Sequence, residues 1–161
     1  MKKLVAFALL TFSAVCATGG VEAFGVRGGL GSSPDQLILG GHAQVYDLSP
    51  EAKIIPNVEL GFGDNITVYS FNAAVHYSFL SSNMNGFTPY AGGELGFNMW
   101  SWDLREGASA AFDDSETKLV LNGVAGLKKK LNDRQELTLE LKLGLSDWAH
   151  DFKVLAGLTF F

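Results

Sequence analysis

The sequence predicts an all-β protein, an eight-stranded antiparallel up-and-down barrel. Three observations lead to this fold class. After the first 23 residues, no long segment repeats its apolar residues at spacings of three and four, whereas alternate positions are apolar in segment after segment. Glycine makes up 19 of the 161 residues, well above the roughly 7% of ordinary proteins. Residues typical of tight turns separate eight alternating segments.

Composition excludes several classes of protein. A hydrophobic content of 47% excludes a disordered chain, and a single cysteine excludes both a disulfide scaffold and a cysteine-built zinc site. A net charge of −5 argues against a nucleic-acid partner, which usually requires a basic patch. We therefore expect no cofactor, no metal and no nucleic acid.

The N-terminus has the features of a secretory signal. Met1-Lys2-Lys3 is basic, and the stretch from Leu4 to Ala17 is uncharged, mostly apolar and too short to cross a bilayer as a helix. Val21-Glu22-Ala23 offers short side chains at the positions that a signal peptidase reads, so we expect export through the Sec pathway with a cut after Ala23. Residues 1–23 are then the signal peptide, residues 24–161 the barrel domain, and Cys16 is absent from the mature protein.

The expected strands follow in order along the mature chain. They are residues 24–30, 37–45, 56–62, 69–79, 91–99, 119–127, 135–146 and 152–161. In the first, alternate residues from Phe24 to Leu30 face away from Arg27. Each of the next five strands has apolar or small residues on one face and polar residues on the other. Strand by strand, the polar residues are His42, Gln44 and Tyr46; Asn57 and Glu59; Ser70, Asn72, His76 and Ser78; Glu94 and Asn98; and Asn122 and Lys128.

The seventh strand shows the alternation most clearly. Odd positions from Leu137 to Leu145 are all leucine, and even positions carry Glu136, Thr138, Glu140, Lys142 and Gly144. The eighth puts Phe152, Val154, Ala156, Leu158 and Phe160 on one face. Connections near 47–53, 80–86 and 131–134 should lie at the end shared with both termini, and those near 31–36, 63–65, 101–117 and 147–151 at the other end.

Alternation alone leaves open which face points outward. A soluble periplasmic or secreted barrel of the lipocalin kind would turn the apolar face inward and bind an apolar ligand. A transmembrane barrel would turn it toward lipid, and the strand lengths, near 9–11 residues, suit a bilayer. Charges at mid-strand and aromatic residues near strand ends also favour the membrane. These aromatics are Tyr46, Phe62, Tyr77, Phe79, Phe87, Tyr90, Trp100, Trp102, Trp148, Phe160 and Phe161.

With its export signal, eight amphipathic strands and aromatic C-terminal strand, the chain resembles bacterial outer-membrane β-barrel proteins, in particular the porin-like, OmpA/OmpX-type eight-stranded group. The stretch from Pro56 to Asp64 resembles a recurring segment of such barrels. The resemblance implies contact with outer-membrane lipid and lipopolysaccharide, a monomer, and insertion by machinery that reads the terminal aromatic, for which Phe160 and Phe161 are both candidates. The peptidoglycan-binding domain of outer-membrane protein A has no counterpart in this sequence.

Five charged residues are predicted to face the barrel interior: Arg27, Glu59, Glu94, Glu140 and Lys142. Charges in a narrow barrel are costly unless paired, so we expect a structural ion-pair network that plugs the lumen. A polar path for small solutes is the alternative. The main expectation is therefore a structural or cell-surface protein without catalysis.

Two further groups of residues could carry a function. His42, His76 and His150 occur singly, with no legible catalytic arrangement, so a lipid A-modifying barrel enzyme is only a third interpretation. The connection 101–117 is the longest, and Trp102, Asp103, Glu106, Asp113 and Asp114 could make surface contacts or share divalent cations with lipopolysaccharide phosphates. A solvated acidic loop is the simpler interpretation.

Overall fold

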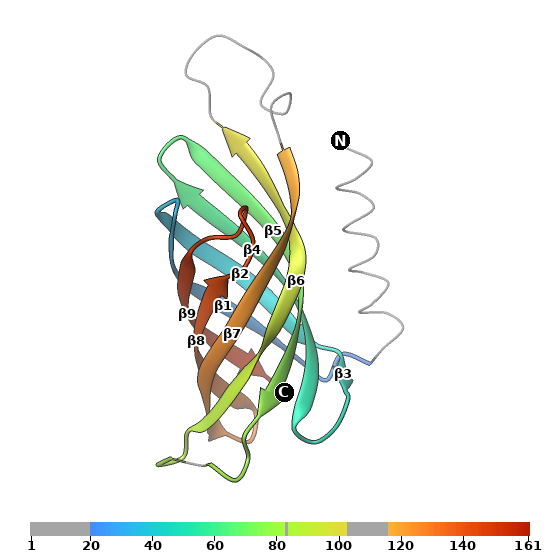
Figure 1. Ribbon diagram of the computed structural model, residues 1–161. Coiled ribbons are helices and arrows are strands. Elements are labelled where there is room, and N and C mark those ends of the chain that lie inside the picture. The colour runs from blue at the N-terminus through green and yellow to red at the C-terminus, as the bar shows by residue number, and fades with distance from the viewer. Residues whose placement is uncertain (1–19, 83, 103–115) are drawn as a thin grey trace.

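The computed structural model describes residues 20–82, 84–102 and 116–161, except for the side chains of Tyr46 and Trp102. Nine strands follow one another along this part of the chain (Figure 1). They are β1 (Ala23–Ser32), β2 (Gln36–Gln44), β3 (Tyr46–Asp47), β4 (Ala52–Gly63), β5 (Ile66–Ser78), β6 (Thr88–Trp102), β7 (Glu116–Asn132), β8 (Gln135–Gly144) and β9 (Phe152–Phe160). No helix within the described ranges is long and apolar enough to cross a membrane.

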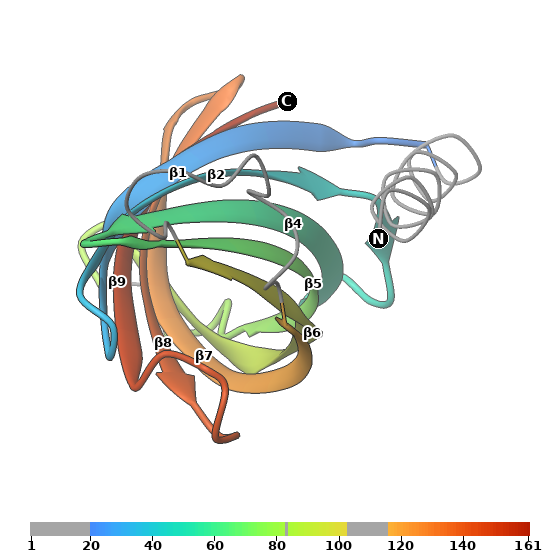
Figure 2. The ribbon, with the colours of Figure 1, turned by 90° about the horizontal axis from the view of Figure 1, so that it is seen from above.

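The strands form one closed antiparallel barrel. Each wall strand pairs with its sequence neighbour, and β1 pairs with β9 from Phe24↔Phe160 to Ser32↔Phe152, which closes the sheet (Figure 2). The two-residue strand β3 pairs only with the start of β4 and adds no wall of its own, because β2 pairs directly with β4. The wall therefore has eight strands, and the predicted fold class is confirmed.

Several strands are longer than their alternating apolar segments. β6 has 15 residues and β7 has 17, although the apolar alternation covers only residues 91–99 and 119–127. Backbone hydrogen bonds between neighbouring strands do not depend on side-chain polarity, so pairing continues past the last apolar residue. The sequence pattern marks the apolar part of each strand, and pairing sets its full length.

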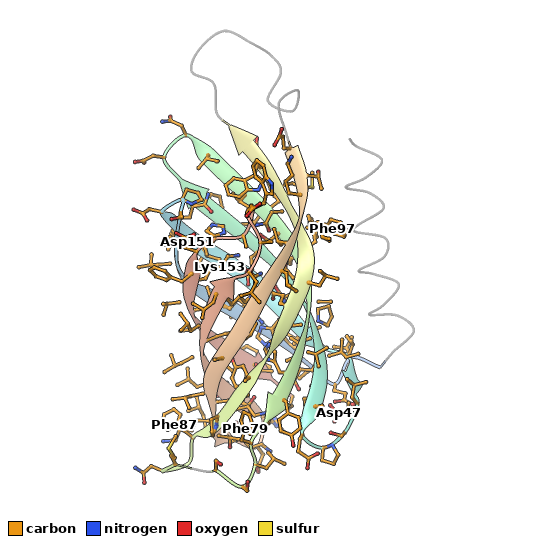
Figure 3. The ribbon with its side chains drawn as sticks, in the orientation of Figure 1. Asp47, Phe79, Phe87, Phe97, Asp151 and Lys153 are labelled. Atoms are coloured by element: carbon orange, nitrogen blue, oxygen red, sulfur yellow. The ribbon has the colours of Figure 1, made fainter. Side chains whose placement is uncertain are left out.

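The apolar face points outward. On β8, Leu139, Leu141 and Leu143 are 40–49% exposed, whereas Glu140 and Lys142 between them are buried. The same alternation runs through the middle of every wall strand, and Figure 3 shows side chains projecting from the outer surface over the height of the barrel. The polar interior excludes an oily ligand cavity, so the lipocalin-like alternative is wrong.

Connections alternate between the two ends of the barrel as predicted. Both the start of β1 and the C-terminus lie at the end that carries the 45–51, 79–87 and 133–134 connections (Figure 1). At the opposite end, β4 and β5 are joined by only Asp64 and Asn65, and Asn65 has a φ of 59°. Asparagine tolerates this left-handed backbone better than most residues, which suits a two-residue hairpin.

Candidate functional site

The most distinctive feature of the interior is a cluster of six charged side chains. Arg27 (β1), Glu59 (β4), Glu94 (β6), Glu140 and Lys142 (β8) all point inward and are at most 9% exposed. The structure brings these five predicted residues together and adds Lys153 of β9, which is 3% exposed. With Lys153 included, three cations face three carboxylates, so the formal charges of the cluster balance.

Lys142 lies at the centre of this cluster. Its ammonium nitrogen is 2.6 Å from Glu59 Oε1 and 2.6 Å from Glu94 Oε2. Around the barrel, β8 and β4 are separated by three strands in either direction, so the Lys142–Glu59 pair joins opposite walls. Lys153 binds the other oxygen of Glu59 at 2.9 Å.

A second ion pair lies beside the central one. Arg27 donates to Glu140 Oε1 at 3.1 Å and lies 3.5 Å from Glu59 Oε1, so it links the two carboxylates. Tyr90 donates its hydroxyl hydrogen to Glu140 Oε2 at 2.7 Å. His76 stacks on the Tyr90 ring and lies 3.7 Å from the same oxygen.

Buried asparagine side chains complete the hydrogen bonding of Glu94. Asn57 donates to Glu94 Oε2 at 2.7 Å, and Asn122 donates to Glu94 Oε1 at 3.0 Å. Asn72 in turn donates to the side-chain oxygen of Asn57. Each oxygen of Glu94 therefore has at least one donor, which offsets the cost of removing the charge from water.

This arrangement closes the middle of the lumen. An eight-stranded barrel has an interior just wide enough for side chains, and here they come from β1, β4, β6, β8 and β9 to meet at the axis. Each charged group of the cluster forms an ion pair with another member of the cluster. Its geometry suits a plug.

A small polar cavity lies between this cluster and the end that carries the termini. It has a volume of about 30 Å³, room for one or two water molecules. His42 and His76 line it, together with Lys53, Lys128 and Glu136. The lumen therefore has a short hydrated vestibule on this side of the plug.

At the opposite end, the connection between β8 and β9 packs against the inside of the barrel. His150 is 2% exposed, stacks on the ring of Trp100, and shares a hydrogen bond of 2.8 Å with Gln36 Oε1. Asn98 donates to the carbonyl oxygen of Trp148, and Ser33 donates to Asp151 Oδ2. These contacts from β2, β6 and the β1–β2 turn hold the connection at this end of the barrel, and we name residues 145–151 the lid.

The environment of His150 fixes its protonation state. Burial of the imidazole and the nearby ammonium of Lys153 together lower the pKa of His150 to about 3. His150 is therefore neutral at physiological pH and acts as a packed, hydrogen-bonded residue of the lid.

The other two predicted histidines are also tied into the interior. His42 accepts a hydrogen bond from Arg27 at its Nδ1 atom, and its Nε2 atom lies 2.8 Å from Thr159 Oγ1. His76 lies beside Glu140, as described above. The three histidines take different hydrogen-bond and ring partners, and in the described part of the chain no three acidic, histidine or cysteine side chains gather as a metal site.

The predicted surface-loop residues belong to the 101–117 connection. Asp103, Glu106, Asp113 and Asp114 lie outside the described residues, as does the side chain of Trp102. The strands that flank this connection end at Trp102 and begin again at Glu116.

The prediction for the aromatic belt needs a correction. Tyr90 and Trp100 are only 4% and 7% exposed and point into the barrel. Both lie an even number of residues from Glu94 on β6, so they point to the same inward face as Glu94. The alternation along the strand, and not the position near a strand end, determines the face on which these two aromatics lie. Phe62, Tyr77, Phe79, Trp148 and Phe161 are exposed, and Phe87 and Phe160 are half-buried.

The C-terminal aromatics occupy different positions. Phe160 is on the outward face of β9 and stacks on Phe24 of β1, with 5.6 Å between ring centres. Phe161 follows the strand and donates its backbone N–H to the carbonyl oxygen of Arg134. Phe160 therefore belongs to the outer surface of the closed barrel.

Sequence reasoning missed Lys153 and the lid. Lys153 could have been found, because it alternates with the outward residues Phe152 and Val154. Contacts made by a connecting loop follow no periodicity, so the sequence held no equivalent signal for His150.

No family model matches the chain, and neither does any curated protein. Solved structures share its fold. The crystal structure of Neisserial surface protein A (NspA) gives a TM-score of 0.65 at 15% identity, over 86% of this chain and 94% of that chain. A designed transmembrane β-barrel gives 0.51 at 14% identity, over 89% and 96%. The outer membrane enzyme PagL gives 0.49 at 12% identity, over 86% and 97%.

Together, the outward apolar face, the closed eight-stranded wall and the charged interior define a β-barrel of the transmembrane class. The fold is that of small outer-membrane barrels, as in Neisserial surface protein A.

Proposed function

We propose that this chain is a bacterial outer-membrane barrel that spans the bilayer as a closed, non-conducting structure, with a structural or cell-surface role and no catalysis. One observation carries the proposal: the same strands expose leucines outward and bury balanced ion pairs inward. On β8, Leu141 is 40% exposed and Lys142 is 1% exposed. A water-soluble protein would gain no stability from exposing its apolar side chains to water and burying its charged ones.

The outer surface supports membrane insertion. Large apolar side chains are exposed on every wall strand, including Phe24, Leu39, Leu60, Val75 and Leu95 on the first five. Contiguous exposed apolar surface of this extent marks contact with lipid or another protein. Because it surrounds the whole barrel, lipid is the partner that fits it.

The interior supports a closed lumen. The Lys142–Glu59 pair joins opposite walls, and the lid residue His150 lies in the mouth at one end. Opening a path would require at least two buried ion pairs to separate, which is costly in a low-dielectric interior. The plug is therefore better suited to stability than to transport.

Export and insertion follow from the two ends of the chain. We propose Sec-dependent export with a cut after Ala23, which would leave the mature chain starting at the second residue of β1. We propose that Phe160 and Phe161 present the C-terminal strand to the insertion machinery, and that lipid and lipopolysaccharide surround a monomeric barrel.

Fractionation and gel mobility test this proposal. The chain would be expressed with its signal intact, the envelope fractionated, and the extract run on a gel with and without boiling. Recovery in the outer membrane with a heat-shifted band is the expected result. Recovery as soluble periplasmic protein with no shift would contradict it.

Conductance tests the plug separately. In planar bilayers, the protein should show no steady open channel. The double variant Glu59→Ala, Lys142→Ala removes the pair that joins opposite walls and should increase ion leakage. Steady conductance of the unmodified protein would contradict a closed lumen.

A further inference from the structure

A lysine interrupts the outward apolar row of β7. The outward residues of this strand run from Leu119 through Leu121 and Leu127 to Lys129, and Leu131 follows at 52% exposure. Lys129 therefore has an apolar neighbour on either side along the outer surface. It is a charge within the apolar surface, not one beyond its edge.

In the part of the chain that the structure describes, Lys129 lies near an aromatic ring and has no carboxylate partner. Its ammonium nitrogen lies 4.9 Å from the ring centre of Phe87. Phe87 is fixed by a pair of backbone hydrogen bonds with Met84, which is 58% exposed. Within the described ranges, Lys129 forms no ion pair. We name the surface formed by Met84, Phe87, Lys129 and Leu131 the rim patch; Figure 3 labels Phe87 at this end of the barrel.

A second lysine on the same strand provides a contrast. Lys118, near the other end of β7, lies 4.3 Å from the ring centre of Trp148 and also forms an ion pair with Glu116 at 3.3 Å. Both lysines contact an aromatic ring, but among the described residues only Lys118 is paired with a carboxylate. Within that part of the chain, Lys129 therefore presents a half-buried positive charge without an ion pair on the outer surface.

The position of Lys129 along the strand matches a membrane boundary. Ten residues separate Leu119 from Lys129. At a rise of about 3.3 Å per residue and a strand tilt of about 40°, this distance spans about 25 Å of the bilayer normal. That is the height of the apolar band of an outer-membrane barrel, so the ammonium group of Lys129 reaches the level of lipid phosphates.

We propose that the rim patch binds a phospholipid with a net negative headgroup, in the leaflet on the side of the chain termini. The phosphate would pair with the ammonium group of Lys129, and the acyl chains would lie along Leu127 and Leu121, on the membrane side of this lysine. A zwitterionic headgroup carries its own cation, which competes with Lys129 for the phosphate. This inference rests on the proposed membrane location.

Lipid retention in native mass spectrometry tests the inference. The folded protein in a nonionic detergent would be mixed with phosphatidylglycerol or with phosphatidylcholine of the same acyl chains. We expect about fivefold greater retention of phosphatidylglycerol, the effect of one lysine near an anionic lipid surface. Lys129→Gln should remove most of this preference, whereas Lys129→Arg and the matched control Lys118→Gln should keep it.

Unchanged preference in Lys129→Gln would overturn the proposal, as would equal retention of both lipids by the unmodified protein. The heat-shifted gel band reports separately whether each variant is a folded barrel, so failure of the membrane proposal is distinguishable from failure of the lipid site. Salt gives a measure that needs no variant: raising ionic strength should reduce the preference of the unmodified protein, because an exposed ion pair is screened. A salt-independent preference would also count against the site.

Discussion

The space around glycine residues differs between the two faces of the barrel wall, and β6 has a glycine of each kind. A Cβ atom at Gly96, on the inward face, would clash with the side-chain oxygen of Asn72 and lie 2.5 Å from the carbonyl oxygen of Phe71. At Gly93, on the outward face, the nearest atom would be the carbonyl oxygen of Asn122 at 3.9 Å. The interior around Gly96 has no space for a methyl group, whereas the outer face at Gly93 has such space.

This difference indicates where stability is determined. Inside, each side chain depends on particular partners, as Lys142 does on Glu59 and Glu94. Outside, one apolar side chain can replace another because lipid adapts to its shape. Substitutions at neighbouring positions on one strand should therefore have very different effects, according to the face they occupy.

The largest expected effect is at the centre of the plug. Lys142→Met removes the cation that two buried carboxylates share, and should lower the free energy of unfolding by about 3–5 kcal/mol. Its matched control is Leu141→Met, on the outward face one residue away, which should change stability by less than about 1.5 kcal/mol. Urea unfolding in lipid vesicles measures both, and equal effects would contradict the distinction between the faces.

The glycine pair on β6 gives an intermediate effect. Gly96→Ala inserts a methyl group against Asn72 and Phe71 and should cost about 1–3 kcal/mol. Gly93→Ala adds a methyl group in open space and should be neutral or stabilise by about 0.4–1 kcal/mol, because alanine restricts the unfolded chain. The same unfolding experiment compares them, and a larger loss at Gly93 would be the contrary result.

The last prediction concerns pH and the lid, where the expected loss of stability is spread over several pH units. Because the pKa of His150 falls from about 6.5 in the unfolded chain to about 3 in the barrel, the unfolded state binds the additional proton between these values. The stability that a neutral His150 provides is complete above pH 6.5 and is lost as pH falls toward 3, by at most about 1.4 kcal/mol per pH unit.

His150→Gln keeps a polar side chain at this position but cannot be protonated. Its stability should fall less steeply than that of the unmodified protein over the same pH range, since the buried carboxylates are common to both. Parallel curves from pH 7 to pH 3 would show that His150 is not the group responsible.

Much of this architecture could be predicted from the sequence, and the limits of prediction have physical causes. The leucines of β8 alternate with Glu140 and Lys142, so the strand and its two faces followed from period-two spacing, and the charges at mid-strand indicated which face is the interior. The phase of β6 also placed Tyr90 and Trp100 inward, and a preference for aromatic residues at membrane boundaries misled the prediction. Position near a strand end is a weaker guide than alternation.

The pairing within the plug could not be predicted. Lys142 and Glu59 are 83 residues apart and meet only because the barrel closes with a particular stagger between strands. Alternation specifies the face of each residue, but not its height in the lumen. The contacts of the lid around His150 depend on the path of a connecting loop, which has no repeating pattern.

The central claim is that outward side chains contact lipid and inward side chains do not. Nuclear Overhauser effects between side-chain methyl groups and lipid acyl chains, recorded in nanodiscs, test it without any substitution. Val154 is 54% exposed, and its neighbour Leu155 is 2% exposed. We predict acyl-chain cross-peaks for the Val154 methyl groups and none for those of Leu155; cross-peaks for Leu155 in their place would contradict the account.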